Sequence, residues 1–195
     1  MFIRQMKTAV LALAVLGILS GLIYPLAITG VAQLLLARQA NGSLLLCGGK
    51  PTGSRLIGQP FDDPKYFWGR PSATQPPYDA SNSSGSNLGP LNPALLKAVQ
   101  ARIDALRKAD PDNRAPVPVD LVTASASGLD PHISPAAAYY QASRVAHARG
   151  LREEDVRRLI ERHTLGRSLG ILGEPGVIVL ELNLALDAGN GSGIE

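Results

Sequence analysis

The sequence predicts a single N-terminal transmembrane helix followed by a soluble α+β (mixed α/β) domain with few strands and about three helices. Three observations lead to this fold class. Residues 8–37 contain no charged side chain, later apolar residues recur at helical spacing between Asn, Pro and Gly residues, and residues 180–187 alternate between leucine and other residues. With 195 residues and 45% hydrophobic content, the chain is long enough for one folded domain beside the helix.

The uncharged segment TAVLALAVLGILSGLIYPLAITGVAQLLLA, residues 8–37, is long enough to cross a bilayer, since about 20 apolar helical residues span the hydrocarbon core. A cleaved signal peptide has an apolar region of roughly 7–15 residues before a small-x-small cleavage site. The present segment is about twice that length, and it continues into LLLARQA without a clear site of this kind. We therefore expect an uncleaved anchor.

Charge is distributed unevenly around this anchor. Arg4, Lys7 and Arg38 flank it, and without them the 16 remaining basic residues balance the 16 acidic ones. The net charge of +3 therefore belongs to the membrane flank and gives little support for a nucleic-acid partner. Because positive residues favour the cytoplasmic side, we expect the N-terminus in the cytoplasm. The expected parts are a cytoplasmic tail at 1–7, a transmembrane helix region at 8–37 and an external soluble domain at 38–195.

Two glycines and a proline stand out within the anchor. Gly17 and Gly21 form a GxxxG motif, in which small residues one turn apart let two helices approach closely in lipid. Pro25 removes a backbone donor and bends a helix unless neighbours compensate. Gly and Pro also occur in helices that only tether a domain, which is the alternative. We expect the three residues to shape a contact with another membrane protein.

Residues 39–90 are rich in Gly, Pro, Ser and Asn and are predicted to be irregular. Four aromatic residues, Tyr66, Phe67, Trp68 and Tyr78, lie within this stretch. Aromatic side chains among Asn and Ser can bind sugars, but more often they pin a long loop to the core. We expect the second role.

Regular structure is expected from Asn92 onward. Asn92 before Pro93 is typical of a helix start, and apolar residues at helical spacing extend this helix to about residue 108. The elements expected after it are a strand at 117–121, a helix near 135–148 that stops at Gly150, a helix near 153–163, and a closing strand at 180–187 with one buried face.

The stretch SGLDPHISPAAA contains residue types found in hydrolase and metal sites. Asp130, His132 and Ser134 occupy alternate positions between Pro131 and Pro135. Alternate residues of an extended segment lie about 6–7 Å apart, which we expect to be too far for direct hydrogen bonds between their side chains. A catalytic triad needs such bonds. Ser134 before Pro135 is typical of a helix N-cap. The five residues are therefore predicted to form a rigid structural turn that starts a helix.

Two other functions are compatible with parts of the sequence. A membrane-tethered external domain could bind a ligand or act as a hydrolase through the Asp, His and Ser of this turn, although the chain contains no G-x-S-x-G motif. Residues 136–164 also resemble a DNA-binding helix-turn-helix. Acidic residues offset the arginines of that segment, as on an ordinary solvated helix face, and the predicted topology places it outside the cell.

Eight motifs spread over almost the whole chain resemble those of one known family. They are GLIYPLAITGVAQ, QANGSL, GSRLIGQPF, YFWGRPSA, YDASNSSGSNLGPLNPAL, PVDLVTASASGLDPHISPAAAYYQ, RVAHARGL and LGEPGVIVLELNLALD. In this order they resemble the C subunits of the bacterial Kdp high-affinity potassium-transporting P-type ATPases. The sequence departs from that family locally, at LLLCGGKP and at Gly176 and Ile178.

The resemblance implies a single-pass subunit of the bacterial inner membrane with its domain in the periplasm. The implied partners are a channel-like potassium-translocating subunit, a P-type ATPase catalytic subunit, a small stabilising membrane peptide and the lipid bilayer, with no nucleic acid. The subunit would carry no catalytic, cofactor-binding or metal residues, because the complex handles ATP and potassium. The family is also described as chaperone-like in raising the ATP affinity of the catalytic subunit, an effect that an external domain could exert only indirectly.

Overall fold

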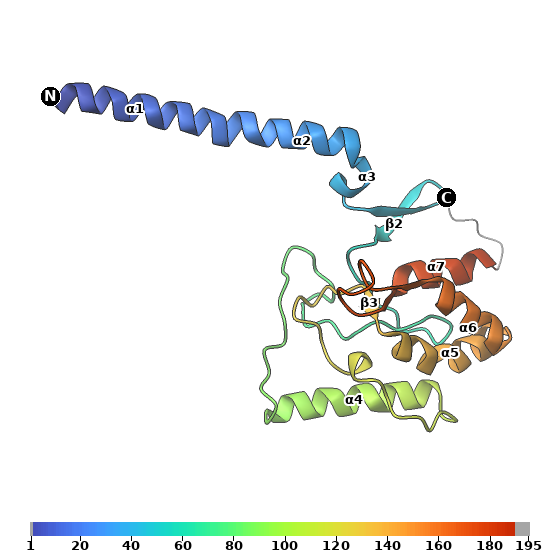
Figure 1. The fold of residues 1–195 in the computed structure, drawn as a ribbon. Helices are drawn as coiled ribbons and strands as arrows, with labels where there is room; N and C mark the ends of the chain where they lie inside the picture. The colour runs from blue at the N-terminus through green and yellow to red at the C-terminus, as the bar shows by residue number, and fades with distance from the viewer. Residues whose placement is uncertain (1, 190–195) are drawn as a thin grey trace. The chain divides into compact units, whose positions relative to one another are not determined.

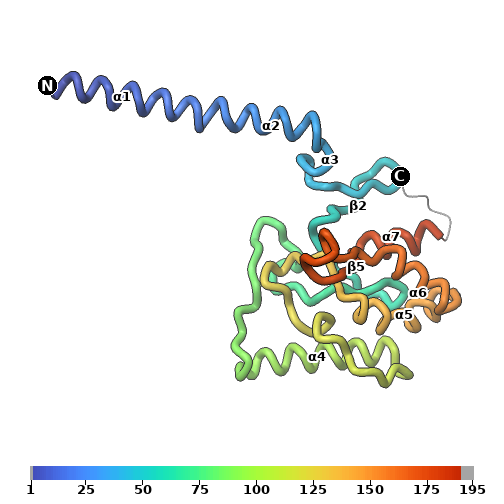
Figure 2. The backbone as a smooth tube through the Cα atoms, viewed as in Figure 1, coloured from blue at the N-terminus to red at the C-terminus, as the bar shows by residue number. Residues whose placement is uncertain are grey.

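A computed structural model describes residues 2–189 of the chain (Figure 1). The chain divides after Ser43 into two units, an N-terminal helical unit and a larger domain. The tube in Figure 2 follows both units along the chain, from the blue N-terminal helix to the red segment that ends the domain.

The N-terminal unit is a long helix with one irregular turn. It consists of α1 at Phe2–Ile18, a π-helical turn η1 at Leu19–Ile23, α2 at Tyr24–Leu35 and a short α3 at Ala37–Ala40. Residues Phe2–Leu35 form a helix that is long and apolar enough to cross a membrane. The helix begins before the uncharged segment, because Arg4 and Lys7 are good helix formers. It ends where Leu36 leaves helical geometry, with φ of −134°.

The larger domain combines four α-helices with two small antiparallel sheets in its described part. Its helices are α4 at Pro93–Ala109, α5 at Pro135–Arg149, α6 at Glu153–Arg162 and α7 at Val179–Gly189, with a 3-10 turn η2 at Val119–Leu121. Its strands are β1 at Leu44–Cys47, β2 at Lys50–Ser54, β3 at His132–Ile133, β4 at Thr164–Leu165 and β5 at Gly176–Ile178. The predicted mixed α/β class with few strands is confirmed, with one helix more than expected.

The helices α4, α5 and α6 match the sequence prediction in position and in their boundaries. Asn92 accepts a hydrogen bond from the backbone N–H of Ala94 at 2.9 Å and so caps α4. Gly150 ends α5 in the left-handed conformation, with φ of +65°, which glycine adopts without steric cost. These local signals decide where the helices begin and end, and the buried face of each helix then packs on the core.

The segment predicted to be irregular begins with a hairpin. β1 pairs antiparallel with β2, and Gly48 and Gly49 connect them with φ of +56° and +74°. Two successive positive φ values are typical of tight hairpin turns, and glycine adopts them readily. The strand sequences contain few β-branched or aromatic residues, which explains why they do not stand out as strands. The chain from residue 55 to residue 92 is loop, as predicted.

The closing segment is a helix, so the predicted strand at 180–187 was wrong. The residues of α7 that are buried are Val179, Leu180, Leu182, Asn183, Leu184 and Leu186, which lie on several sides of the helix. A helix enclosed by protein on most sides carries apolar residues around its circumference, so leucine at every second position does not distinguish it from a strand. Leu, Ala and Glu, which dominate the segment, are also strong helix formers.

The predicted strand at 117–121 was wrong as well. This segment is loop followed by the η2 turn. Pro116 and Pro118 carry no N–H and cannot take part in a sheet ladder, which is why alternating apolar residues do not pair here. Leu121 is nevertheless fully buried, so the alternation reflects packing against the core.

The second sheet lies next to the core of the domain. β5 pairs antiparallel with β3 on one side and with β4 on the other. The largest fully buried apolar side chains are Phe67, Leu106, Leu121, Ile133, Val145, Val156, Ile160, Val177 and Leu182. They come from the long loop, from η2, from two strands and from all four helices. This core positions both the aromatic loop and the turn before α5.

Candidate functional site

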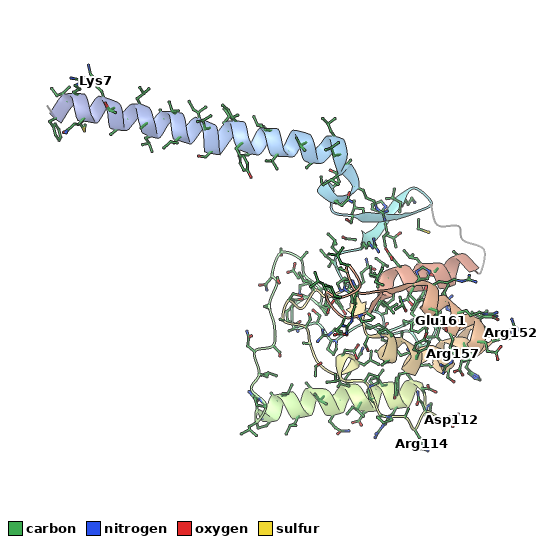
Figure 3. The ribbon with its side chains drawn as sticks, in the orientation of Figure 1. Lys7, Asp112, Arg114, Arg152, Arg157 and Glu161 are labelled. Atoms are coloured by element: carbon green, nitrogen blue, oxygen red, sulfur yellow. The ribbon has the colours of Figure 1, made fainter. Side chains whose placement is uncertain are left out.

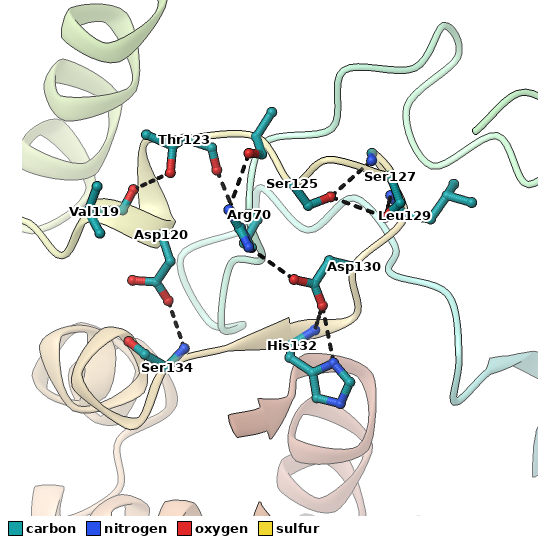
Figure 4. Close-up of polar contacts among 12 residues, drawn as sticks. Arg70, Val119, Asp120, Thr123, Ser125, Ser127, Leu129, Asp130, His132 and Ser134 are labelled. Carbon is teal, nitrogen blue, oxygen red and sulfur yellow. Dashed lines mark hydrogen bonds and ion pairs between the residues drawn. The ribbon is translucent and has the colours of Figure 1, made fainter. Parts of the chain in front are cut away.

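The polar residues of the turn before α5 form a connected cluster (Figure 4). Arg70 Nη1 lies 3.1 Å from Asp130 Oδ2, and Asp130 Oδ1 lies 3.1 Å from His132 Nδ1. The backbone N–H of His132 also donates to Asp130 Oδ1, at 3.0 Å. The expectation that side chains two positions apart cannot meet was wrong. The Asp130 carboxylate folds back over the chain in an Asx-type turn, and this brings it within reach of the imidazole.

Arg70 joins this turn to a neighbouring loop. Its Nε donates to the Thr123 carbonyl at 3.4 Å, and its Nη2 donates to the Ala124 carbonyl at 3.2 Å. Burial raises the pKa of the Asp130 carboxyl, but hydrogen bonds from His132 and Arg70 outweigh this effect and hold the pKa below its ordinary value. Asp130 is therefore ionised at neutral pH and serves as a cross-link between two loops.

Ser134 caps α5. Its Oγ accepts a hydrogen bond from the N–H of Ala137 at 3.0 Å, and its own N–H donates to Asp120 Oδ2 at 2.7 Å. Pro135, the first residue of α5, has no N–H that would need a partner. Among the hydrogen bonds of residues 2–189, none joins Ser134 Oγ to His132. The Asp–His pair of the turn is therefore not extended to a serine nucleophile.

A cavity of about 490 Å³ opens beside the cluster. Its polar lining residues are Arg70, Asp120, Asp130, His132, Ser134, Ser168 and Glu174. Glu174 pairs with Arg167 at 2.8 Å, so the cavity is bordered by ion pairs. Within the part of the chain that the structure describes, no group of three or more His, Cys, Asp or Glu side chains could hold a metal ion.

A backbone hydrogen bond ties the turn before α5 to the start of α7. The N–H of Val179 donates to the Pro131 carbonyl at 3.0 Å.

Two buried amides hold the aromatic loop against the core. Asn183 Oδ1 accepts the N–H of Phe67 at 2.8 Å, and Asn183 Nδ2 donates to the Phe67 carbonyl at 3.0 Å. Gln141 makes the same pair of bonds with Trp68, at 2.8 and 3.1 Å. Each amide supplies the partners that a sheet would otherwise give these backbone groups. The aromatic residues thus pin the long loop, as the sequence indicated.

Sequence reasoning missed these amides and the arginines around Trp68. The guanidinium groups of Arg144 and Arg102 lie 4.7 Å and 5.1 Å from the centre of the Trp68 ring. Burial lowers the pKa of Arg144 to about 10, and burial also lowers the pKa of Arg102. Asn183, a polar residue in an apolar segment, is a signal that could have indicated a buried hydrogen-bonding role.

The residues expected to pack against another membrane protein lie along the N-terminal helix. Apart from the adjoining backbone of its own helix, a Cβ added at Gly17 or Gly21 would meet no described atom within 4 Å, so both positions present open backbone. Pro25 follows η1, where the N–H of Tyr24 donates to the Leu19 carbonyl, five residues back. Side chains project from this helix along its whole length in Figure 3. The helix therefore has room for a second helix at its two glycines.

Comparison with known proteins identifies the family. Residues 6–188 match the model of a family described as KdpC: K+-transporting ATPase, c chain. The match takes in the N-terminal helix and the domain as far as the last turn of α7. The chain belongs to the KdpC family. The resemblance carried by the eight motifs is thereby confirmed.

Individual KdpC relatives are similar over the same extent. The protein named potassium-transporting ATPase KdpC subunit from Polaromonas naphthalenivorans (strain CJ2) is 67% identical over 184 residues, 94% of this chain and 94% of the relative. The protein of that name from Sorangium cellulosum (strain So ce56) is 62% identical over 186 residues, 95% of this chain and 98% of the relative. The one from Herpetosiphon aurantiacus is 63% identical over 182 residues, 93% and 94% of the two chains.

The KdpC match leaves the helix-turn-helix hypothesis for α5 and α6 without support. Two arginines of α6 and the arginine at its N-cap are paired with acidic residues of the same helix. Arg157 pairs with Glu153 at 2.7 Å, Arg152 pairs with Asp155 at 2.7 Å, and Arg158 contacts the same aspartate. Figure 3 shows Arg152 and Arg157 on the surface of the domain. Charges paired in this way are typical of a solvated helix face, whereas a phosphate-binding face keeps its arginines available.

Proposed function

We propose that this chain is a non-catalytic membrane subunit of an ATP-driven, high-affinity potassium-uptake complex, in which it assembles and stabilises the other subunits. The observation that carries the proposal is the KdpC-family match over residues 6–188, which includes both the helix and the domain. Relatives with 62–67% identity are named as subunits of a potassium-transporting ATPase. The partners that we propose are the channel-like potassium-translocating subunit, the P-type ATPase catalytic subunit and a small stabilising membrane peptide.

The exposed helix supports an assembly role. Nearly all described residues of α1, η1 and α2 are exposed within their own unit, so lipid or protein must cover them in a membrane. Small residues contribute to helix association by letting two backbones approach, and a helix that faced only lipid would gain nothing from them. We propose that Gly17, Gly21 and Pro25 contact a transmembrane helix of a partner subunit.

Orientation follows from the charges at the helix ends. Arg4 and Lys7 precede the apolar segment, and the positive-inside rule places them in the cytoplasm. We therefore propose that the chain lies in the bacterial inner membrane, with residues 1–7 in the cytoplasm and the domain from residue 38 in the periplasm. The bilayer then separates the domain from cytoplasmic ATP. Any effect of this subunit on the ATP affinity of the catalytic subunit would act through conformational coupling.

On the domain, we propose that the loop-rich region 60–90 and the rigid turn 127–138 form the surface that docks the partner subunits. The residues that keep the turn in one shape are Asp130, Pro131, His132, Ser134 and Pro135. Their hydrogen bonds to neighbouring loops, together with the two amides that hold the aromatic loop, make this surface preformed. A preformed surface loses less conformational entropy on binding than a flexible one.

A hydrolase or ligand-binding role for the same turn has less support. Paired aspartate and histidine side chains occur in catalytic sites, but here Asp130 forms an ion pair with Arg70, and the hydroxyl of Ser134 caps α5. Of the charged groups that line the cavity, Arg70 and Asp130 pair with each other, Glu174 pairs with Arg167, and Asp120 accepts the N–H of Ser134. The geometry therefore favours a structural cross-link.

Leucine substitution of the two glycines tests the assembly proposal. We expect Gly17→Leu/Gly21→Leu to lower the recovery of the larger subunits with the tagged chain in mild detergent, because the added side chains prevent close helix contact. Thr8→Leu/Ala12→Leu is the matched control. It adds leucines at the same spacing, about 180–220° around the helix from Gly17 at 100° per residue, and should leave recovery unchanged. Undiminished recovery with the glycine variant would contradict the packing proposal.

A further inference from the structure

The irregular turn in the N-terminal helix has more backbone acceptors than donors. In an α-helix, each carbonyl accepts a hydrogen bond from the N–H four residues later. At η1, the N–H of Tyr24 donates to the Leu19 carbonyl, five residues back, so it is drawn away from the Ser20 carbonyl. Pro25 has no N–H, and the Gly21 carbonyl loses its donor as well. The carbonyls of Ser20 and Gly21 thus lack the main-chain donors that a regular α-helix would give them.

The nearest hydroxyl does not compensate for this surplus. Ser20 Oγ donates to the Leu16 carbonyl at 2.7 Å, which lies in the turn before η1. Gly21 has no side chain, and apart from the adjoining backbone of its own helix no described atom lies within 4 Å of where a Cβ would stand. The backbone at this point is therefore accessible to a group that approaches from outside the helix.

The turn also lies where an unsatisfied carbonyl is most costly. The uncharged segment runs from residue 8 to residue 37, and η1 at Leu19–Ile23 occupies its middle. If that segment spans the bilayer, the turn lies near the midplane, about as far from water as the chain can reach. Backbone groups freed by proline in such helices are re-satisfied by neighbouring helices, by side chains, by ordered water or by local 3-10 and π adjustments of the helix itself.

We propose that the Gly21 carbonyl, whose α-helical donor Pro25 removes, accepts a hydrogen bond from a Ser, Thr, Asn or Gln side chain on a transmembrane helix of a partner subunit. This inference rests on the assembly role proposed above, and it names the chemistry of the contact. Acyl chains carry no donors, so lipid cannot satisfy this carbonyl. Gly17 lies just before the turn and Gly21 lies within it, and both allow a second backbone close enough for a short side chain to reach the turn.

Pro25→Ala tests the proposal, because alanine restores the N–H that the Gly21 carbonyl lacks without adding bulk beside the glycines. The full-length chain and a complex prepared without it would be combined in lipid nanodiscs, and their dissociation constant measured. We expect the variant to bind about three-fold more weakly, the effect of one average interhelical hydrogen bond in lipid. Binding of Pro25→Ala equal to that of the unchanged chain would overturn the proposal.

A double-mutant cycle separates the hydrogen bond from a change in helix bend. A photo-crosslinking residue at Leu22 first identifies the partner helix, and its nearest donor is then exchanged for an apolar isostere, such as threonine for valine. We expect this exchange to weaken binding about three-fold when Pro25 is present and to have no effect on Pro25→Ala. Additive effects, or crosslinks to a helix without such a donor near the site, would overturn the inference.

The two proposals fail separately. If Gly17→Leu/Gly21→Leu abolishes binding and Pro25→Ala does not weaken it, helix packing stands and the hydrogen bond is wrong. If the glycine variant binds as the unchanged chain does, the assembly role of the helix is wrong, and the hydrogen bond that depends on it is wrong too.

Discussion

Replacing Asn183 by alanine removes the amide that holds the aromatic loop on α7. Asn183 is only 1% exposed, and its two hydrogen bonds to Phe67, itself 0% exposed, are 2.8 and 3.0 Å long. In the variant, the N–H and the carbonyl of Phe67 lose their partners in a buried environment. Each buried polar group left unsatisfied costs about 1–3 kcal/mol. We therefore expect the free energy of unfolding to fall by about 2–6 kcal/mol, a large fraction of the stability of a typical domain.

Trp68 provides the assay for this change. It is the only tryptophan of the chain, is 6% exposed and directly follows Phe67, so its fluorescence reports release of the loop. Urea unfolding of the full-length chain in detergent would give the free energy of unfolding of each variant. Gln100→Ala is the control, because it removes an exposed amide that contacts only Asp104 among the described hydrogen bonds. We expect the control to stay within about 0.5 kcal/mol of the unchanged chain.

A loss in Asn183→Ala as small as that of the control would refute the reasoning. It would mean that water or a local shift satisfies Phe67 without the amide, and that the loop is held by apolar packing alone. The conclusion that buried amides fix the position of the aromatic loop would then have to be abandoned.

Other expectations concern the turn before α5 and the orientation of the chain. Because the pKa of Asp130 is lowered, its ionised form stabilises the fold above about pH 4, and this contribution is lost as the pH falls through the lowered pKa. In urea titrations, the stability difference between the unchanged chain and Asp130→Asn should therefore shrink below about pH 4. A difference that stays constant with pH would contradict the cross-link. Ser134→Ala should lose about 1 kcal/mol of stability in the same titrations, since it removes an N-cap, and an unchanged midpoint would argue against the cap. His132→Ala should support nearly normal potassium transport, whereas abolished transport in a folded and assembled variant would favour a binding or catalytic role. Cys47, the only cysteine of the sequence, should react with a membrane-impermeant maleimide on intact spheroplasts. A cysteine introduced by Gln5→Cys, in a chain that also carries Cys47→Ser, should react only after the membrane is opened. The reverse pattern would contradict the proposed orientation.

The sequence was sufficient for features that depend on neighbouring residues. The uncharged segment from residue 8 to residue 37 predicts a membrane helix because length and apolarity are local properties. The caps at Asn92 and Ser134 and the stop at Gly150 were predictable because a side chain or a φ value acts within one turn of the helix. Family membership could also be inferred from the sequence, since the eight motifs cover nearly the whole chain.

Features that depend on burial, on the conformation of a side chain or on distant residues could not be predicted in this way. The leucine alternation in α7 fits a strand as well as a helix, and only burial on several sides of the segment decides between them. The Asp130–His132 contact depends on an aspartate side chain that folds back along the backbone, and spacing along an extended chain does not describe such a turn. The bonds from Asn183 to Phe67 join residues 116 positions apart, for which one sequence offers no pairing signal.

The central claim is that the chain is a subunit of a potassium-transporting ATPase complex. Its most direct test is to purify the tagged full-length chain in mild detergent from membranes of potassium-starved cells, identify the co-purifying proteins and assay ATP hydrolysis. We expect a channel-like potassium-translocating protein and a P-type ATPase to co-purify, with ATP hydrolysis that potassium stimulates. Recovery of the chain alone, from membranes in which other complexes stay intact, would contradict the claim.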